Sequence, residues 1–520
     1  MHPGSATPGE LPAGRHRLAL PEDGMGVMRF LISPTELLGD WPEIHRAYVS
    51  GFDRHVFPTQ VEISGNQLIC RRLHSDSGKL HVAFPVAGYG RPVLATSSLR
   101  ERELPYLLPL ELARGRIAEV RDQASQWEQI HMIIPNEYRD AERQAFQLFC
   151  QASAVQANPE ETCRLAGLSL VEACRASDLL LKAYTAQRLA VSHRATDNPP
   201  ASLGCALPWD VPDEPTREVF CDTFQAAALP IEWKRIEPVE GHYQWNIIDR
   251  LLDCCIEHRQ LPRGGPLIDL GAGGLPQWLA PWESDVVNMQ SFVCDWVETA
   301  VSRYMGRIRL WEVSASGNSG GALAISEENR LGLVARTLEI AGRTDDDAQL
   351  FIRVDQPWGD YQARGQHRLS PFQFADAIVR SNLGLAGVNL EISVGFQPHG
   401  CLSRDMFSVS RLIDYWSLLG IQLHVTLAFP SSPDADPLAN QDLEVAAPVW
   451  KGECSEELQA EWIRTFVPLL MAKPAVTGVY WTHFSDALPH RFPHAGLLGP
   501  DGAPKPAFDA MQRQQHVGRG

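Results

Sequence analysis

Apolar and polar residues follow three different patterns along this chain, and each pattern predicts a different kind of structure. Between residues 28 and 103, short β-rich runs such as VFPTQVEI (56–63) and KLHVAFPV (79–86) alternate with polar turns. Runs of this length between Gly, Asn, Asp and Ser clusters are typical of strands. We therefore expect a small β-rich domain over residues 28–103, preceded by a disordered leader over residues 1–27.

From residue 104 onward the apolar residues recur three and four positions apart, which indicates helices. We expect a helical segment over residues 104–195, made of three helices at 105–130, 136–155 and 161–195. The polar, proline-containing stretch TDNPPAS (196–202) then interrupts the pattern and is the best domain boundary.

Between residues 196 and 515, short apolar runs alternate with helical stretches. The expected strands lie at 202–208, 225–231, 266–270, 308–314, 349–354, 387–392, 421–429 and 476–484. Eight strands with intervening helices predict an α/β fold, a (β/α)8 TIM barrel. A doubly wound open sheet is the structural alternative. The stretch GAGG (271–274) lacks the spacing of a nucleotide-binding motif and does not support that alternative.

Composition narrows the classes of partner. The chain has 520 residues and a formal net charge of −17, which argues against nucleic acid and anionic membranes. It shows neither an apolar run long enough to span a membrane nor a secretory signal pattern, so we expect a cytoplasmic protein. The 11 cysteines lack CxxC spacing, so neither a disulfide framework nor a zinc site is indicated.

Seven sequence blocks in a fixed order span the expected barrel. They are EWKRIEPVEGHYQW (232–245), LPQWL (275–279), RLWEV (309–313), GFQPHG (395–400), GIQLHVT (420–426), VYWTHFSD (479–486) and LLGPDGAPKPAFDAM (497–511). Together these blocks resemble glycoside hydrolase family 10, the retaining β-xylanases. The resemblance covers residues of about 200–515 and implies a barrel that handles β-linked sugars through two catalytic carboxylates.

Neither catalytic carboxylate stands where the resemblance implies it. The family's acid ends a W-D-V-V-N-E block, which here reads WEVSAS (311–316) and places Ser316 at the acid position. The nucleophile belongs in I-H-I-T-E-L-D, which here reads LHVTLAF (423–429) and places Leu427 there. Retaining hydrolysis needs two carboxylates about 5 to 5.5 Å apart. We therefore expect a glycosidase-like barrel that lacks ordinary retaining catalysis.

Three other carboxylates are alternative candidates for catalysis, because chemistry in barrels sits at the carboxyl ends of strands. They are Asp269 on the third strand, Asp355 after the fifth and Glu391 on the sixth. Each also has a structural explanation, as a turn cap or as a member of an ion pair. Glu312 is expected to lie about 13 Å below Ser316 and too deep to touch a ligand.

Several residues within the matched blocks are candidates for binding a sugar, namely Trp233, Trp278, Gln397, His399, Trp481, His483 and Asp486. Indole faces are flat apolar platforms, although a tryptophan in a barrel is more often part of the core. No cofactor and no metal are predicted. His490 and His494 are four residues apart, but Pro489 and Pro493 break the helix that would align them.

Three functions remain open at this point. The first is a pseudo-glycosidase that binds carbohydrate without hydrolysing it. The second is an active O-glycosyl hydrolase with a rearranged pair of carboxylates, which would lie near 5.5 Å or about 6.5 to 9.5 Å apart. The third is an assembly or regulatory protein that uses residues 28–195 to bind a protein partner and the barrel as a scaffold. An apolar patch on the helices of 104–195 would favour the third function.

Overall fold

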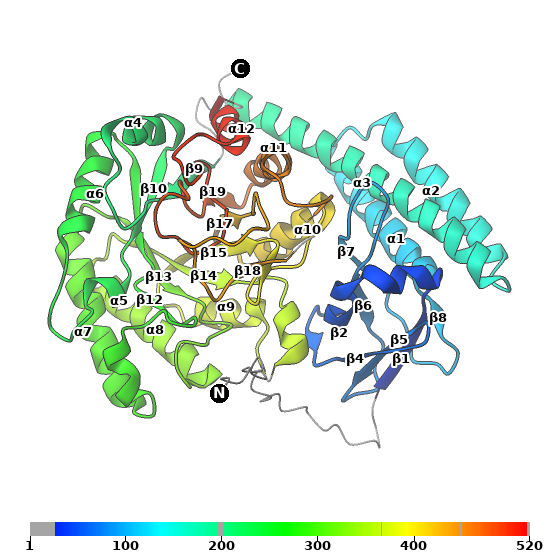
Figure 1. Cartoon of the computed structure of the whole chain (residues 1–520), viewed down its shortest axis with the longest axis horizontal. Helices are drawn as coiled ribbons and strands as arrows, with labels where there is room; N and C mark the ends of the chain where they lie inside the picture. Colours follow the sequence, from blue (N-terminus) through cyan, green and yellow to red (C-terminus); the bar gives the residue numbers. More distant parts are fainter. Residues whose placement is uncertain (1–25, 196–200, 366, 447–449, 517–520) are drawn as a thin grey trace, which may run out of the picture.

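The computed structural model describes residues 26–195, 201–365, 367–446 and 450–516 (Figure 1). The expected disordered leader therefore lies almost entirely outside the described residues, as does most of the expected boundary at 196–202. Within the described residues, a β-rich region and a group of long helices lie on one side of an α/β barrel (Figure 1).

The expected β-rich region consists of two small sheets. One has the strand order β4-β5-β1-β8 and the other β3-β2-β6-β7. On β5, inward Leu68, Cys70 and Arg72 alternate with more exposed neighbours, the period-2 pattern of a half-buried strand. The elements are β1 (Gly26–Leu31), η1 (Thr35–Asp40), η2 (Pro42–Arg46), β2 (Tyr48–Ser50), β3 (Val56–Phe57), β4 (Gln60–Ser64), β5 (Gln67–Arg72), β6 (Lys79–Ala83), β7 (Val93–Ala95) and β8 (Tyr106–Leu107).

Three long helices follow, close to their predicted positions: α1 (Leu108–Gln129), α2 (Asn136–Ala154) and α3 (Pro159–Ala195). Two of them join the two halves of the molecule. Leu112 of α1 and Leu170 of α3 belong to the core of the β-rich region. Further along the same helices, Trp127 and Leu180 belong to the core of the barrel. The helices therefore link the two halves through continuous apolar packing.

Eight parallel strand positions close into a barrel, because the last strand pairs with the first. The predicted TIM barrel is thus confirmed, and the open-sheet alternative is wrong. The strands are β9 (Ser202–Ala206), β10 (Ala226–Pro230), β11 (Leu261–Gly265) with β12 (Ile268–Asp269), β13 (Leu310–Ala315), β14 (Gln349–Asp355), β15 (Leu385–Ser393), β17 (Gln422–Ala428) and β19 (Val476–Trp481).

The third strand begins earlier than predicted. The sequence pattern placed it at 266–270, whereas β11 already pairs with β10 and β13 over residues 261–265. Its sequence, LPRGG, contains three residues that disfavour strands and therefore hides it. One glycine has a packing reason, since a Cβ on Gly264 would lie 2.8 Å from the Trp311 ring. Glycine at position 264 therefore leaves room for the buried Trp311 indole, although it lowers the β propensity of the strand.

Helices surround the barrel, and most of the longer ones begin at a side chain that accepts a backbone N–H. These N-caps are Asp213, Asp285, Ser326, Ser370, Asp405 and Ser455. The remaining elements are α4 (Glu214–Thr223), α5 (Trp233–Ile236), α6 (Asn246–Glu257), η3 (Gln277–Trp282), α7 (Val286–Tyr304), α8 (Glu327–Thr344), η4 (Asp360–Arg364), α9 (Pro371–Arg380), β16 (Phe396–Gln397), α10 (Met406–Trp416), η5 (Ser417–Leu419), β18 (Glu444–Val445), α11 (Glu456–Met471) and α12 (Pro506–His516). None of the described helices is both long and apolar enough to cross a membrane.

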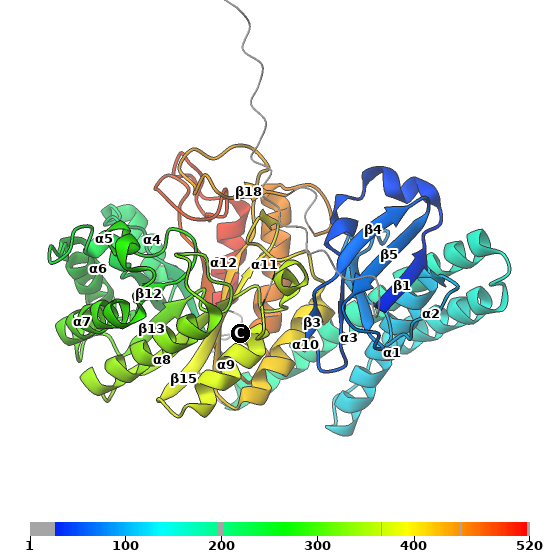
Figure 2. The ribbon, with the colours of Figure 1, turned by 90° about the horizontal axis from the view of Figure 1, so that it is seen from below.

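The β-rich region packs against the barrel on the side of α10 (Figure 2). We call this contact the seam. It holds a buried ion pair between Arg116 of α1 and Asp405, with 2.6 Å between Nη2 and Oδ2. Two backbone hydrogen bonds also cross the seam: Thr59 N–H donates to the Ala363 carbonyl, and Val93 N–H donates to the Ser403 carbonyl. Because the seam combines backbone bonds, an ion pair and apolar contacts, the two halves form one continuous structure.

Candidate functional site at the barrel mouth

A cavity of about 480 Å³ lies at the carboxyl ends of the barrel strands. This volume falls within the range of small-molecule sites. We call it the mouth cavity. Its lining combines the tryptophans Trp209, Trp233 and Trp481 with charged and polar groups that include Arg263, Asp269, Glu312, Arg353, Thr426, His483, His490 and Arg491. Aromatic surfaces with a few convergent polar groups are what a sugar ligand requires.

Glu312 forms the floor of the mouth cavity, although the sequence spacing predicted that it would be too deep. Its carboxylate accepts a hydrogen bond of 2.5 Å from the Asn389 amide and lies 3.4 Å from the Arg353 guanidinium. Arg263 is more distant, at 3.9 Å. Glu312 is therefore a buried carboxylate held by an amide and by arginine, and it also lines the mouth cavity.

Asp355 and Glu391 lie side by side, since they are register partners on β14 and β15. Glu391 Oε2 lies 2.8 Å from Arg491 Nη1 and 3.4 Å from Arg353 Nη1. Asp355 instead accepts the hydroxyl proton of Ser319, whose Oγ lies 2.8 Å from Oδ1 and 2.7 Å from Oδ2. Burial, followed by the negative charge of Glu391, raises the pKa of Asp355. Both side chains are buried, and neither lines the mouth cavity.

Asp269 does line the mouth cavity. It accepts a hydrogen bond of 2.9 Å from the Gly271 backbone N–H, as a turn cap would. Burial by itself would raise the pKa of Asp269, but the charges of Arg353 and Arg491 outweigh burial and lower it. The carboxylate therefore stays ionised at neutral pH, and it suits binding or charge stabilisation better than proton donation.

The two positions at which the sequence resemblance expects carboxylates, Ser316 and Leu427, lie in different surroundings. Ser316 directly follows β13, has a left-handed backbone with φ of 55°, and is buried beside Asp269. Leu427 is 1% exposed and belongs to the apolar core of the barrel. Its neighbour Thr426 lines the mouth cavity instead and hydrogen-bonds to Asn389. Ser316 carries a hydroxyl and Leu427 an isobutyl group, so neither position holds a carboxylate.

The three candidate tryptophans have unequal access to the mouth cavity. Trp233 lines it but stacks on Trp296, and its indole N–H donates to Glu237. Trp481 also lines it, with its indole N–H bonded to the Ala495 carbonyl. Trp278 does not line it and packs edge-on against Trp233. Trp278 therefore supports the wall of the cavity rather than forming it.

Gln397 and His399 lie away from the mouth cavity, contrary to the expectation from the GFQPHG block. Gln397 is on the short strand β16, which pairs with β18, and it lines a separate cavity of about 240 Å³. His399 is exposed and lies outside the lining of either cavity. The sequence block is retained, but its two polar side chains do not reach the barrel mouth.

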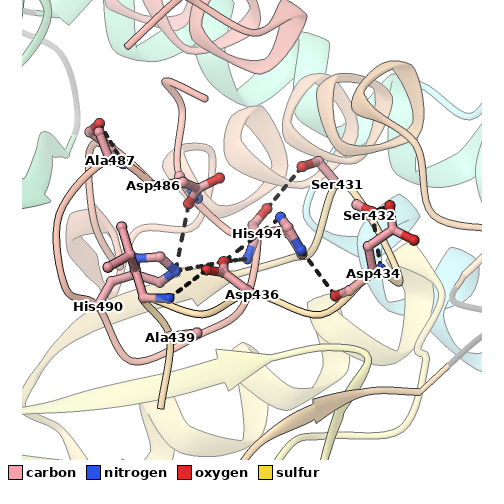
Figure 3. A network of polar contacts seen from close by, with 12 residues as sticks. Ser431, Ser432, Asp434, Asp436, Ala439, Asp486, Ala487, His490 and His494 are labelled. Carbon is pink, nitrogen blue, oxygen red and sulfur yellow. Dashed lines mark hydrogen bonds and ion pairs between the residues drawn. The ribbon is translucent and has the colours of Figure 1, made fainter. Parts of the chain in front are cut away.

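His483 and Asp486 contact each other on the loop after β19, with 2.9 Å between Nε2 and Oδ1. Only His483 lines the mouth cavity. The Asp486 carboxylate also accepts hydrogen bonds from the Lys505 ammonium and from the Gly496 backbone N–H. Burial by itself would raise the pKa of Asp486, but His483 and Lys505 outweigh burial and hold this pKa far below its usual value. Burial lowers the pKa of His483 to about 4. Figure 3 shows Asp486 within a larger network that includes His490 and Asp436.

A model of glycosyl hydrolase family 10 matches residues 226–513. The chain belongs to this family, which confirms the resemblance found in the sequence blocks. It is 23% identical, over 321 residues, to endo-1,4-beta-xylanase B of Thermotoga neapolitana, a match that covers 58% of this chain and 84% of the xylanase.

Solved structures of family 10 xylanases also resemble the chain. Xylanase 10B of Thermotoga maritima is 16% identical with a TM-score of 0.47, covering 64% of this chain and 97% of the other. Family 10 protein from Paenibacillus barcinonensis is 17% identical with a TM-score of 0.48, covering 64% and 97%. The matched family region begins at β10, so the β-rich region and helices α1–α3 lie outside it.

Two arginines organise this family 10 mouth, and sequence reasoning missed both. Arg353 contacts Glu312 and Glu391, and Arg491 contacts Glu391. Strand alternation in QLFIRV was the available signal for Arg353, because an arginine between apolar neighbours on a barrel strand points to a buried partner. Arg491 lies in a proline-rich loop without periodicity, so the sequence offers no comparable signal for it.

Proposed function

We propose that this family 10 barrel binds carbohydrate of the xylan type and does not perform ordinary retaining hydrolysis. The proposal rests on Ser316 and Leu427, which stand at the two positions where the sequence resemblance expects the family's carboxylates. General acid catalysis alone contributes about 10²- to 10⁴-fold to such reactions. Loss of the nucleophile as well removes the covalent route.

The mouth cavity supports the binding half of the proposal. Its volume of about 480 Å³ accommodates a short oligosaccharide. Trp209 offers a half-buried indole, while Asp269 and Arg491 offer a charged acceptor and donor for sugar hydroxyls. Because the related Thermotoga neapolitana protein is named an endo-1,4-beta-xylanase, β-1,4-linked xylose oligomers are the first ligands to test.

The test combines calorimetric binding of xylo-oligosaccharides with a hydrolysis screen on aryl β-xylosides and the same oligomers. We expect saturable binding without turnover. Trp209→Ala is expected to weaken binding roughly tenfold, about 1.4 kcal/mol. The matched control Trp282→Ala removes a partly exposed indole outside the cavity lining and is expected to leave binding unchanged. Absence of binding to every sugar would overturn the proposal and favour a scaffold role for the barrel.

A second candidate function, a glycosidase with a rearranged carboxylate pair, is favoured by one observation. Asp355 has a raised pKa beside Glu391, which is how an acid and a base are separated in many active sites. Their position outside the lining of the mouth cavity weighs against it. Turnover that is abolished by Asp355→Asn, Glu391→Gln or Asp269→Asn would establish this second function and overturn the first.

A further inference from the structure

The loop after β19 gathers metal-ligand side chains that the proposed function does not use. His483, Asp486 and His490 each offer one ligand atom, and these atoms all lie within 4.8 Å of one another. In Figure 3, dashed lines join His490 to both Asp486 and Asp436. Pro489 and Pro493 would break a helix in this loop, so the sequence pattern alone predicts no metal site here. The structure brings the ligands together from an irregular loop, so no helix is required.

The spacing of the ligand atoms fits a small metal ion. Ligand atoms around a tetrahedral zinc ion lie about 3.3 Å apart, given zinc–nitrogen and zinc–oxygen bonds of about 2.0 to 2.1 Å. His483 Nε2 and Asp486 Oδ1 are 2.9 Å apart, and His490 Nε2 and Asp486 Oδ1 are 3.9 Å apart. The two imidazole rings stack with centroids 4.3 Å apart and 17° between their planes, so one ring must rotate for both nitrogen lone pairs to face a single ion.

Neighbouring groups already orient the ligands. His490 Nδ1 lies 2.8 Å from the Leu488 carbonyl, which only accepts, so Nδ1 donates and Nε2 faces the carboxylates. A second-shell bond of this kind is common among metal-binding histidines. The Gly496 N–H holds Asp486 Oδ1, and Lys505 holds the other oxygen of that carboxylate. These contacts hold the Asp486 carboxylate and the His490 tautomer in place, and one of the two stacked imidazoles still has to turn toward the ion.

Asp436 completes the surroundings. Its Oδ2 lies 2.9 Å from His490 Nε2 and accepts the His494 backbone N–H at 2.9 Å. Two carboxylates thus approach His490 Nε2, as they would around a cation bound to that nitrogen. His483 Nδ1 is buried without a hydrogen-bond partner among the described residues, so this histidine is not committed to a second polar contact.

We propose that His483, Asp486 and His490 bind a divalent transition-metal ion, zinc in particular, with Asp436 as a fourth ligand or an orienting partner of His490. His483 and His490 also line the mouth cavity, so the ion would border the place where a sugar is proposed to bind. Two imidazoles with one or two carboxylates are a ligand set that suits zinc. This site goes beyond the proposed function and does not depend on it.

A second cluster on the outer helices, Cys221, Cys254 and His258, is a weaker candidate. Thiols bind metals as thiolates. Burial raises the pKa of Cys221 to about 12, and burial also raises that of Cys254, so deprotonation would oppose binding there. This cluster nevertheless has to be controlled in any metal titration of the whole protein.

The test uses the full chain, stripped with chelator and dialysed, and titrated with zinc chloride. Metal content after gel filtration gives the stoichiometry. We expect one zinc ion per chain, and at least about tenfold weaker binding in His483→Gln and in His490→Gln. His258→Gln is the matched control and is expected to keep the ion. Circular dichroism of each variant checks that it is folded.

Cobalt substitution distinguishes the two clusters without relying on a variant. Tetrahedral cobalt bound by nitrogen and oxygen gives visible d–d bands without a sulfur-to-cobalt charge-transfer band. We expect this spectrum, and we expect it to disappear in the double variant His483→Gln, His490→Gln. The proposal is overturned if the native chain binds no zinc, if only His258→Gln loses the ion, or if cobalt shows the sulfur band.

Discussion

The mouth cavity and the seam both concentrate charge, but they balance it differently. At the mouth, Glu312 and Glu391 share Arg353, and Glu391 also meets Arg491. At the seam, a cavity of about 280 Å³ is lined by five cationic side chains and one acidic one, Glu119. The five are Arg54, Lys79, Arg116, Arg404 and Arg411. The mouth thus pairs its charges directly, whereas four of the five cations at the seam share three carboxylates, Asp405, Asp360 and Glu119, of which only Glu119 lines the cavity.

This difference shows what each region can tolerate. Paired charges at the mouth depend on one another, so removal of Arg353 leaves Glu391 with Arg491 alone and Glu312 with Asn389 and the more distant Arg263. The cations at the seam oppose any further positive charge nearby. His81, stacked on Tyr48 with ring centroids 4.6 Å apart, lies among them. Burial, followed by Arg404, Lys79 and Arg54, lowers the pKa of His81 to about 3.

The largest effect is expected from Arg353→Met at the mouth. The variant leaves Glu312 and Glu391 without the arginine that both contact. We expect a loss of about 3 to 5 kcal/mol in the apparent free energy of unfolding, measured by urea denaturation.

The matched control is Arg380→Met, which breaks the exposed pair of Arg380 and Asp376 on α9. An exposed pair is worth about 0 to 1 kcal/mol, so little change is expected. If Arg353→Met were as mild as this control, the charges at the mouth would not be mutually dependent, and the contrast with the seam would fail.

An intermediate effect is expected from His81→Phe at the seam. The folded pKa of His81 lies near 3, below the unfolded value of about 6.5. A depressed histidine pKa means that the unfolded chain binds the proton more tightly, so the stability contributed by neutral His81 is present above about pH 6.5 and is lost as the pH falls toward 3. Between pH 7 and 5 this loss amounts to about 2 kcal/mol.

His81→Phe keeps the aromatic stack on Tyr48 and removes the titrating group. We expect the native chain to lose this stability between pH 7 and 5 and the variant to lose about 2 kcal/mol less, in urea denaturation at each pH. The exposed His399→Phe should follow the native pH dependence. An unchanged slope in His81→Phe would show that a proton enters the seam easily, despite the cations that line it.

The sequence predicted the barrel well, because its framework depends on periodicity and on local motifs. The LPQWL and PKPAFDAM blocks and eight apolar runs were enough to place the strands, apart from β11, whose LPRGG sequence carries no strand pattern. The site was predicted less well. GFQPHG is retained as a block, yet pairing of β16 with β18 places Gln397 away from the mouth cavity.

Contacts between distant segments explain the remaining misses. Arg491 reaches Glu391 across 100 positions of sequence, and His490 meets Asp436 across 54. Neither pair leaves a periodic or local signal, because the loops that carry Asp436, His490 and Arg491 have no regular structure. Positions on strands could be inferred from alternation, whereas the partners of loop residues required the folded structure.

The smallest effect is expected from Asp355→Asn, which removes a negative charge beside Glu391, whereas Arg353→Met removes a positive one. Burial and the charge of Glu391 raise the folded pKa of Asp355 above its unfolded value. The folded state then binds the proton more tightly, so stability is highest at low pH and declines as the pH rises through the folded pKa. The Ser319 hydroxyl donates to Asp355 and would still find the carbonyl oxygen of an asparagine.

Asp355→Asn should therefore stabilise the chain relative to the native protein at pH 7, and this gain should be smaller at pH 4, because a lower pH favours the neutral form of the native carboxyl. Urea denaturation at the two pH values measures the difference, and the exposed Asp140→Asn serves as the control. A loss of stability at pH 7 would mean that Asp355 is held as a needed anion. In that case the mouth would consist of paired charges throughout, and Asp355 would no longer be suited to act as the acid of a rearranged glycosidase.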